Sequence, residues 1–205
     1  RIAFVNKMDR IGADFFDVVA QMRGKLGATP VVLQLPIGSE DRFSGVVDLV
    51  GMKAYLFETD GSGKFKEADV PADMSDEAQA AREALIEMVA EADDTLMEKF
   101  FEVGTLTQDE LVSGLRTAVL ARKIFPLFCT SAILNVAVPM LLDAVLAYVP
   151  APSERPAKGT KGGQEVEVLA SEGGPYAAFV WKTVADPFAG RISMFRVMSG
   201  SLKAD

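Results

Sequence analysis

The chain opens with a short apolar run that ends abruptly in polar residues. Ile2 to Val5 are all apolar, and Asn6, Lys7 and Asp9 follow within the next few positions. Such a run, placed before a helical pattern, predicts a buried parallel strand and so constrains the chain to an open α/β sheet. Open α/β sheets bind their ligands beyond the carboxyl ends of the strands. The polar segment after this strand is therefore the first candidate binding site.

The three polar side chains suit a guanine base. Guanine presents two adjacent donors, its ring N1–H and its exocyclic amine, and the ionised carboxylate of Asp9 can accept both. Adenine lacks this pair and would leave a desolvated carboxylate unpaired, which discriminates strongly against it. Lys7 can lay its aliphatic stem over the base, and the amide of Asn6 can tie the loop to neighbouring backbone. A plain strand-to-helix turn is the alternative that these residues alone leave open.

A second apolar segment, over 124–129, repeats the pattern. It predicts another buried strand, which ends in small residues before a helix predicted over 138–148 with Asn135 as its cap. The stretch Asn6-Lys-Met-Asp-Arg10 after its strand resembles the guanine-reading loop of translational GTPases. Phe128-Cys-Thr-Ser-Ala132 resembles their second base-contacting loop.

Other stretches extend the resemblance along nearly the whole chain, in the same order as in the elongation factor G family of these GTPases. They include Val31–Ser39, Phe43–Val50, Leu141–Val145, Tyr148–Pro152 and Asp186–Arg191. The resemblance implies a fragment of a ribosomal translocase, a GTPase that moves tRNA and mRNA during elongation.

The resemblance assigns guanine binding to five residues. Asn6, Lys7 and Asp9 would contact the base, helped by Ser131 and Ala132, with the backbone N–H around Ala132 facing the guanine carbonyl oxygen. The implied cofactor is GTP or GDP, with Mg²⁺ in the full-length parent. One departure follows the second loop, where the sequence Ile-Leu-Asn-Val-Ala-Val lacks the lysines and the glycine common in the family.

The element pattern and the resemblance together give the fold class. Helices are expected over 14–26, 75–92, 94–103 and 138–148, with a capping box opening another at Thr107, and strands over 31–35, 43–49, 52–57, 175–184 and 191–199. We expect an α/β chain: the C-terminal part of a P-loop GTPase domain with an inserted α+β subdomain, then the first strands of an antiparallel β-barrel. The expected limits are 1–30 and 123–150 for the GTPase part, 31–122 for the insert, 151–174 for a linker and 175–205 for the incomplete barrel domain.

No stretch carries the motif that cradles nucleotide phosphates. Gly63-Lys64 imitates the end of a P-loop, but Glu58 and Phe65 stand where the motif needs glycine and a hydroxyl side chain. The segment 59–64 is interpreted instead as a hairpin loop. The sequence also has no histidine, which excludes Ser-His-Asp triads and histidine-containing metal sites within it. We predict no catalytic residue and no metal ligand here, and no GTP hydrolysis by these residues alone.

The composition indicates which partners the chain can bind and which cellular compartment suits it. A formal charge of −8 over 205 residues argues against a general nucleic-acid clamp, which needs basic surface. No apolar run approaches the ~20 residues of a membrane span, and a single cysteine, Cys129, fits a reducing, cytoplasmic setting. The resemblance implies the ribosome as partner of the full-length parent, with the insert facing the ribosomal stalk protein. Otherwise the acidic faces of the helices over 75–103 are ordinary solvated surface.

Three alternatives stay open on sequence grounds. The chain could derive from a paralogue, either the release-factor GTPase or a ribosomal-protection factor, although the short loop over 185–191 favours the elongation factor G family. The segment 31–122 could instead act solely as a protein-docking module. The chain could also come from a family member that has lost rapid hydrolysis.

Overall fold

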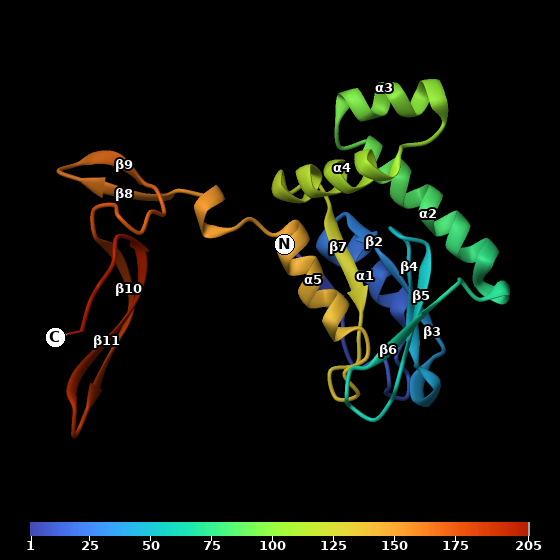
Figure 1. Cartoon of the computed structure of the whole chain (residues 1–205), viewed down its shortest axis with the longest axis horizontal. Helices are drawn as coiled ribbons and strands as arrows, with labels where there is room; N and C mark the ends of the chain where they lie inside the picture. Colours follow the sequence, from blue (N-terminus) through green and yellow to red (C-terminus); the bar gives the residue numbers. More distant parts are fainter. Residues whose placement is uncertain (205) are drawn as a thin grey trace. The chain divides into compact units, whose positions relative to one another are not determined.

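The computed structural model describes residues 1–204, and the chain divides into two units between Val149 and Pro150. The elements of the first unit are β1 (Ala3–Val5), α1 (Phe15–Leu26), β2 (Pro30–Val32), β3 (Gln34–Ile37), β4 (Gly45–Asp48), β5 (Lys53–Phe57), β6 (Phe65–Ala68), α2 (Ser75–Ala90), α3 (Asp94–Val103), α4 (Gln108–Leu120), β7 (Phe125–Cys129) and α5 (Val138–Tyr148) (Figure 1). The mixture of parallel and antiparallel sheets confirms the α/β class expected from the sequence.

A three-stranded parallel sheet in the order β1-β7-β2 carries the candidate site. Its register pairs Val5 with Cys129, so β1 and β7 end at the same edge. Successive β7 side chains point to opposite faces. Leu127 and Cys129 pack in one cluster with α1, and Phe128 packs in the other with α5, so the two helices cover opposite faces of the sheet (Figure 1).

Local capping explains where two of the helices begin and end. Asp14 starts α1 by accepting the backbone N–H of Asp17 at 2.9 Å, and the left-handed Gly27 ends it. The capping box predicted at Thr107 is present at the start of α4, where Thr107 and Glu110 satisfy each other's backbone N–H groups.

The second sheet of unit 1 is antiparallel, in the order β3-β4-β5-β6. Its buried side chains, such as Leu35 and Val47, share one cluster with Leu85 of α2 and Leu115 of α4. The β5–β6 pairing confirms the hairpin predicted around 59–64.

The single strand predicted over 31–35 is wrong in one respect. The segment forms two strands: β2 pairs with β7 in the parallel sheet, and β3 pairs with β4 in the antiparallel sheet. The limit expected between 30 and 31 therefore falls inside β2. The largely apolar segment could not show this change, because hydrophobicity indicates burial and does not identify the partner strand.

The second unit contains two antiparallel hairpins. One joins β8 (Ala157–Lys161) to β9 (Gln164–Val168), and the other joins β10 (Ala177–Asp186) to β11 (Gly190–Ser199). The second hairpin confirms the two predicted C-terminal strands. The first lies within 151–174, which was predicted as a linker, and Gly162 and Gly163 supply its two-residue turn with φ of 60° and 83°. In the described part of the chain, no helix is long and apolar enough to cross a membrane.

Candidate functional site

Two loops leave the parallel sheet at the same edge, and backbone hydrogen bonds join them. The N–H of Thr130 donates to the carbonyl oxygen of Val5 at 2.8 Å, and the N–H of Met8 donates to the carbonyl of Thr130 at 3.2 Å. The side chain of Met8 is buried and anchors the first loop in the core. The geometry therefore brings the two segments that the sequence marked into direct contact.

The side chain of Asn6 bridges these loops. Its Oδ1 accepts the backbone N–H of Ala132 at 3.0 Å and lies 3.4 Å from the hydroxyl of Thr130. This contact agrees with the expectation that Asn6 ties its loop to neighbouring backbone. The Ala132 N–H that the resemblance assigns to the guanine carbonyl oxygen donates here to Asn6.

Asp9 and Ser131 form the second bridge. The Ser131 hydroxyl donates to Asp9 Oδ1 at 2.6 Å, and its oxygen accepts the N–H of Leu134 at 3.3 Å. Ser131 is fully buried, so this hydroxyl approaches the carboxylate from the protein interior. The other carboxylate oxygen lies 3.4 Å from Nε of Arg10, an exposed side chain whose ion pair contributes little. One oxygen of Asp9 is thus fixed from inside, and the other remains near the surface.

Lys7 has an unusual backbone conformation. Its φ is 66°, the left-handed region, which costs a residue with a side chain roughly 1–2 kcal/mol. The N–H of Arg10 donates to the carbonyl of Lys7 at 3.0 Å and closes the turn. Asn6 and Lys7 border a cavity of about 300 Å³ that α1 also lines through Asp17. Asp9, Ser131 and Ala132 are not among the residues that line this cavity.

The β5–β6 loop reaches this site, which the sequence did not suggest. Nδ2 of Asn135 donates to the carbonyl of Gly61 at 3.4 Å, and a Cβ built on Gly63 would lie 2.4 Å from the same nitrogen. Asn135 is therefore not the cap of α5, which was the prediction. Ala137 holds that position in a left-handed conformation with no side-chain cap.

Asn6 and Asp9 join two loops at the carboxyl edge of a parallel sheet, which is where α/β domains bind their ligands. A model of the elongation factor Tu GTP-binding domain family matches residues 1–151, and the chain belongs to this family. Its members are translation-factor GTPases, so membership implies guanine-nucleotide binding.

A crystal structure of a protein from Thermus thermophilus has a similar fold, with a TM-score of 0.77 and 29% sequence identity. The match covers 99% of this chain and 28% of that one. The chain therefore spans less than a third of the length of the solved protein that it resembles.

The residues present do not form a metal site. Across residues 1–204, no group of three or more His, Cys, Asp or Glu side chains is placed to hold a metal ion. The two loops contribute one carboxylate, Asp9, and Ser131 already uses one of its oxygens. The Mg²⁺ implied by the family has no fitting ligand set among these residues.

Proposed function

We propose that the two loops form the guanine-recognising part of a ribosomal GTPase of the elongation factor G type. The observation that carries this proposal is the hydrogen bond from the buried Ser131 hydroxyl to Asp9 at 2.6 Å. A carboxylate held from one side keeps a fixed direction, so it needs no reordering when a base arrives.

Each residue then has a defined role toward the base. Asp9 accepts the N1–H and the exocyclic amine of guanine through the lone pairs that Ser131 leaves free. The stem of Lys7 covers one face of the ring, and its left-handed backbone sets the direction of that stem. Asn6 holds Ala132 in place, and the Ala132 N–H reaches a guanine carbonyl oxygen by sharing its bond to Asn6. Selectivity against adenine follows, because adenine leaves the carboxylate unpaired.

The longer protein is proposed to move tRNA and mRNA on the ribosome, in the cytoplasm. The resemblance in the same order along residues 1–202 supports this, as does the resemblance of the short 185–191 loop. In this scheme 31–122 is the inserted subdomain and 175–205 opens an antiparallel barrel domain. Phosphate binding, Mg²⁺ ligation and hydrolysis are assigned to other segments of the longer protein.

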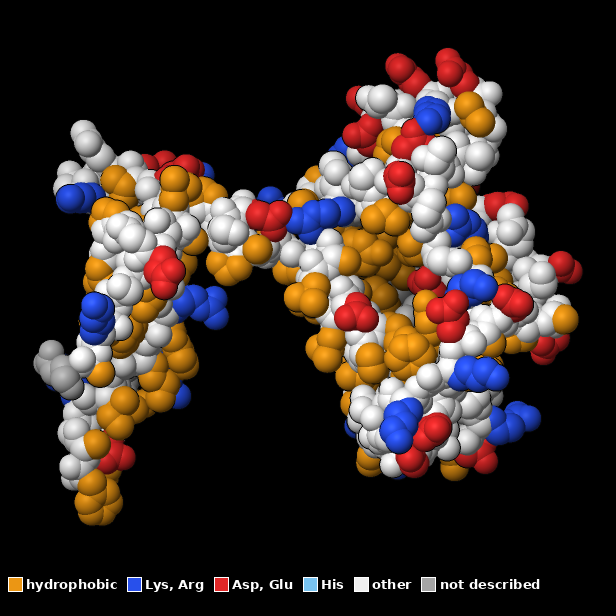
Figure 2. Space-filling model, viewed as in Figure 1, with side chains coloured by type: hydrophobic (Ala, Val, Ile, Leu, Met, Phe, Trp, Pro, Cys, Tyr) orange, Lys and Arg blue, Asp and Glu red, His pale blue; other side chains and the backbone are white. Residues whose placement is uncertain are grey.

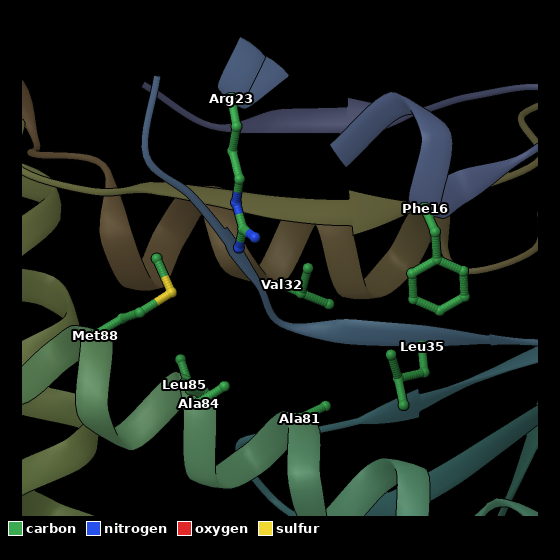
Figure 3. Close-up of a pocket in the computed structure, with 8 residues that line it drawn as sticks. All are labelled: Phe16, Arg23, Val32, Leu35, Ala81, Ala84, Leu85 and Met88. Carbon is green, nitrogen blue, oxygen red and sulfur yellow. The ribbon is translucent and has the colours of Figure 1, made fainter. Parts of the chain in front are cut away.

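The inserted subdomain is proposed to dock the ribosomal stalk protein. A cleft of about 140 Å³ lies between α1, the β2–β3 segment and α2, and Figure 3 shows side chains from all three pointing into it. Its lining is apolar apart from Arg23, and Phe16 is half exposed at its edge. Figure 2 shows acidic side chains gathered over α3, which would orient a basic partner.

Calorimetric titration of the intact chain with GDP, and with ADP as control, tests the base site. We expect weak, guanine-selective binding that is lost in Asp9→Ala and retained in Asp73→Ala, the same substitution at an exposed aspartate of a short 3-10 helix. Equal heats for GDP and ADP would refute the assignment.

Titration with the isolated stalk protein tests the docking face. Ala84→Arg places a bulky cation in the cleft and should abolish binding, whereas Ala121→Arg, also exposed but outside the cleft, should not. Equal binding by both variants would remove the cleft from the interface.

A further inference from the structure

Unit 1 has another cavity, between α5 and the antiparallel sheet. Its volume is about 220 Å³. In Figure 2 hydrophobic side chains surround a recess between α5 and this sheet. The polar residues that line the cavity are Gln34, Asp48, Tyr55, Asp143 and Tyr148. None of them belongs to the proposed guanine site.

Strand register explains why two of these side chains lie together. Gln34 of β3 pairs directly with Asp48 of β4, so both project from the same face of the sheet. That face turns toward α5, because Asp143 and Tyr148 of α5 line the same cavity. Leu35 and Val47, on the opposite face, pack in the cluster with α2.

One polar atom of the cavity lining, Oε1 of Gln34, has no hydrogen-bond partner within residues 1–204. The side chain of Gln34 is 1% exposed, and its Oε1 is the one buried side-chain N or O atom in the described residues without a hydrogen bond. Buried amide oxygens are normally satisfied, and an unsatisfied one is costly. A donor-bearing ligand or water in the cavity would remove that cost.

In the described residues, the two carboxylates that line the cavity form no direct ion pair. Among residues 1–204, neither Asp48 nor Asp143 has a lysine or arginine nitrogen within 4.0 Å. Arg82, the charged neighbour of Asp48, donates instead to the carbonyl oxygens of Leu49 and Val50. Burial raises the pKa of Asp48, and burial together with Asp48 raises the pKa of Tyr148 to about 12.

The cavity also offers aromatic faces. Tyr55, Phe128 and Tyr148 line it, and aromatic rings attract organic cations placed over them. The volume equals roughly seven water molecules at about 30 Å³ each, which is enough for a small cation of several heavy atoms.

We propose that this cavity binds an organic cation of the primary ammonium or guanidinium class. Asp48 supplies the counter-charge, Gln34 supplies a further acceptor, and the tyrosine rings flank the cation. The same chemistry is offered by a free small cation and by a lysine or arginine side chain of a partner protein. Bound between α5 and the sheet, either one would stabilise the packing of these two parts of unit 1.

The test is calorimetric titration of the intact chain with methylguanidinium and with butylammonium, using butanol as the uncharged control. We expect saturable binding of the cations and none of butanol. Asp48→Asn, which keeps an oxygen for the N–H of Gly51, should weaken binding roughly tenfold. Asp41→Asn makes the same charge change at an exposed site and should leave affinity unchanged.

A capped Gly-Gly-Arg-Gly-Gly peptide distinguishes the two sources. Binding of the peptide as well as methylguanidinium identifies a protein side chain as an acceptable occupant, and binding of the free cations alone identifies a small molecule. Absence of cation binding, or equal weakening by Asp41→Asn and Asp48→Asn, would overturn the proposal. If Asp48→Asn loses its helical circular dichroism signal, Asp143→Asn at the exposed rim serves instead, with an expected loss of roughly twofold or more.

Discussion

The substitution Ser131→Ala should measure how much the hydrogen bonds between the two loops stabilise unit 1. The substitution removes the 2.6 Å bond from the hydroxyl to Asp9 and the 3.3 Å bond that it accepts from the N–H of Leu134. Ser131 is fully buried, and alanine leaves Asp9 Oδ1 and the N–H of Leu134 without these partners.

The magnitude follows from these two bonds. A hydrogen bond to a charged group contributes about 1.5–3 kcal/mol net, and a long neutral one contributes roughly 0.5 kcal/mol. Partial reorientation of Asp9 toward the surface recovers some of this. We therefore expect Ser131→Ala to lower the free energy of unfolding of unit 1 by about 2 kcal/mol.

Urea unfolding followed by far-ultraviolet circular dichroism is the assay, because the α-helices of the described chain all lie in unit 1. Ser113→Ala is the matched control. Its hydroxyl is exposed and bonds only to carbonyls of its own helix, so a change within about 0.5 kcal/mol is expected.

A double-mutant cycle with Asp9→Ala isolates the pair. A coupling free energy of about 1 kcal/mol or more is expected, since the residues are in direct contact. A loss for Ser131→Ala no larger than that of Ser113→Ala, or additive effects in the cycle, would refute the locked geometry.

Three further predictions concern other parts of unit 1. Hydrogen bonds from Lys99, the larger effect, and from Thr107 lower the pKa of Glu110 from 4.5 to about 2. The charged Glu110 should therefore stabilise the fold fully above its pKa in the unfolded chain, and this stabilisation should vanish as the pH falls toward 2. Thermal unfolding of the original chain and of Glu110→Gln across this pH range measures the effect. Burial raises the pKa of the Cys129 thiol and shields it, so a thiol reagent should modify it only at the rate of unfolding. Gly63→Ala should destabilise unit 1 by roughly 1–2 kcal/mol, because φ is 72° and the new Cβ meets Asn135.

Controls sharpen these three tests. Gly104→Ala has a similar φ of 76° and no atom within 4 Å of the new Cβ, so any additional loss of stability in Gly63→Ala comes from the Asn135 contact. Rapid thiol modification of the folded protein would contradict the buried position of Cys129. A pH-independent effect of Glu110→Gln would show that its charge is not what stabilises α4.

Helices were the most predictable part of the fold. The capping box of α4 could be predicted because Thr107 and Glu110 are three residues apart and interact locally. The separation of β2 from β3 was not predictable, because Val31 to Leu35 is largely apolar and both strands are buried. The β8–β9 hairpin was also missed, since a segment rich in glycine and charge favours a linker unless Gly162-Gly163 is taken as a turn.

Some features of the candidate site could likewise be predicted from the sequence, and others could not. Asn6 and Asp9 could be proposed because their chemistry matches a base directly. Their mutual arrangement with Thr130 and Ser131 depends on the parallel register of β1 and β7, which joins residues more than a hundred positions apart. The contact between Asn135 and the β5–β6 loop required tertiary structure as well, because nothing in the local sequence marks Asn135 as the partner of a distant carbonyl.

The most direct test of the guanine site is a change of base preference in Asp9→Asn. Xanthine replaces the exocyclic amine of guanine with a carbonyl, and an asparagine amide can accept the ring N–H while donating to that carbonyl. Titration of both proteins with GDP and xanthosine diphosphate should show preference for GDP in the original chain and for xanthosine diphosphate in the variant, each by roughly tenfold or more. Retention of the GDP preference in Asp9→Asn, or no base preference in either protein, would contradict the proposed role of Asp9.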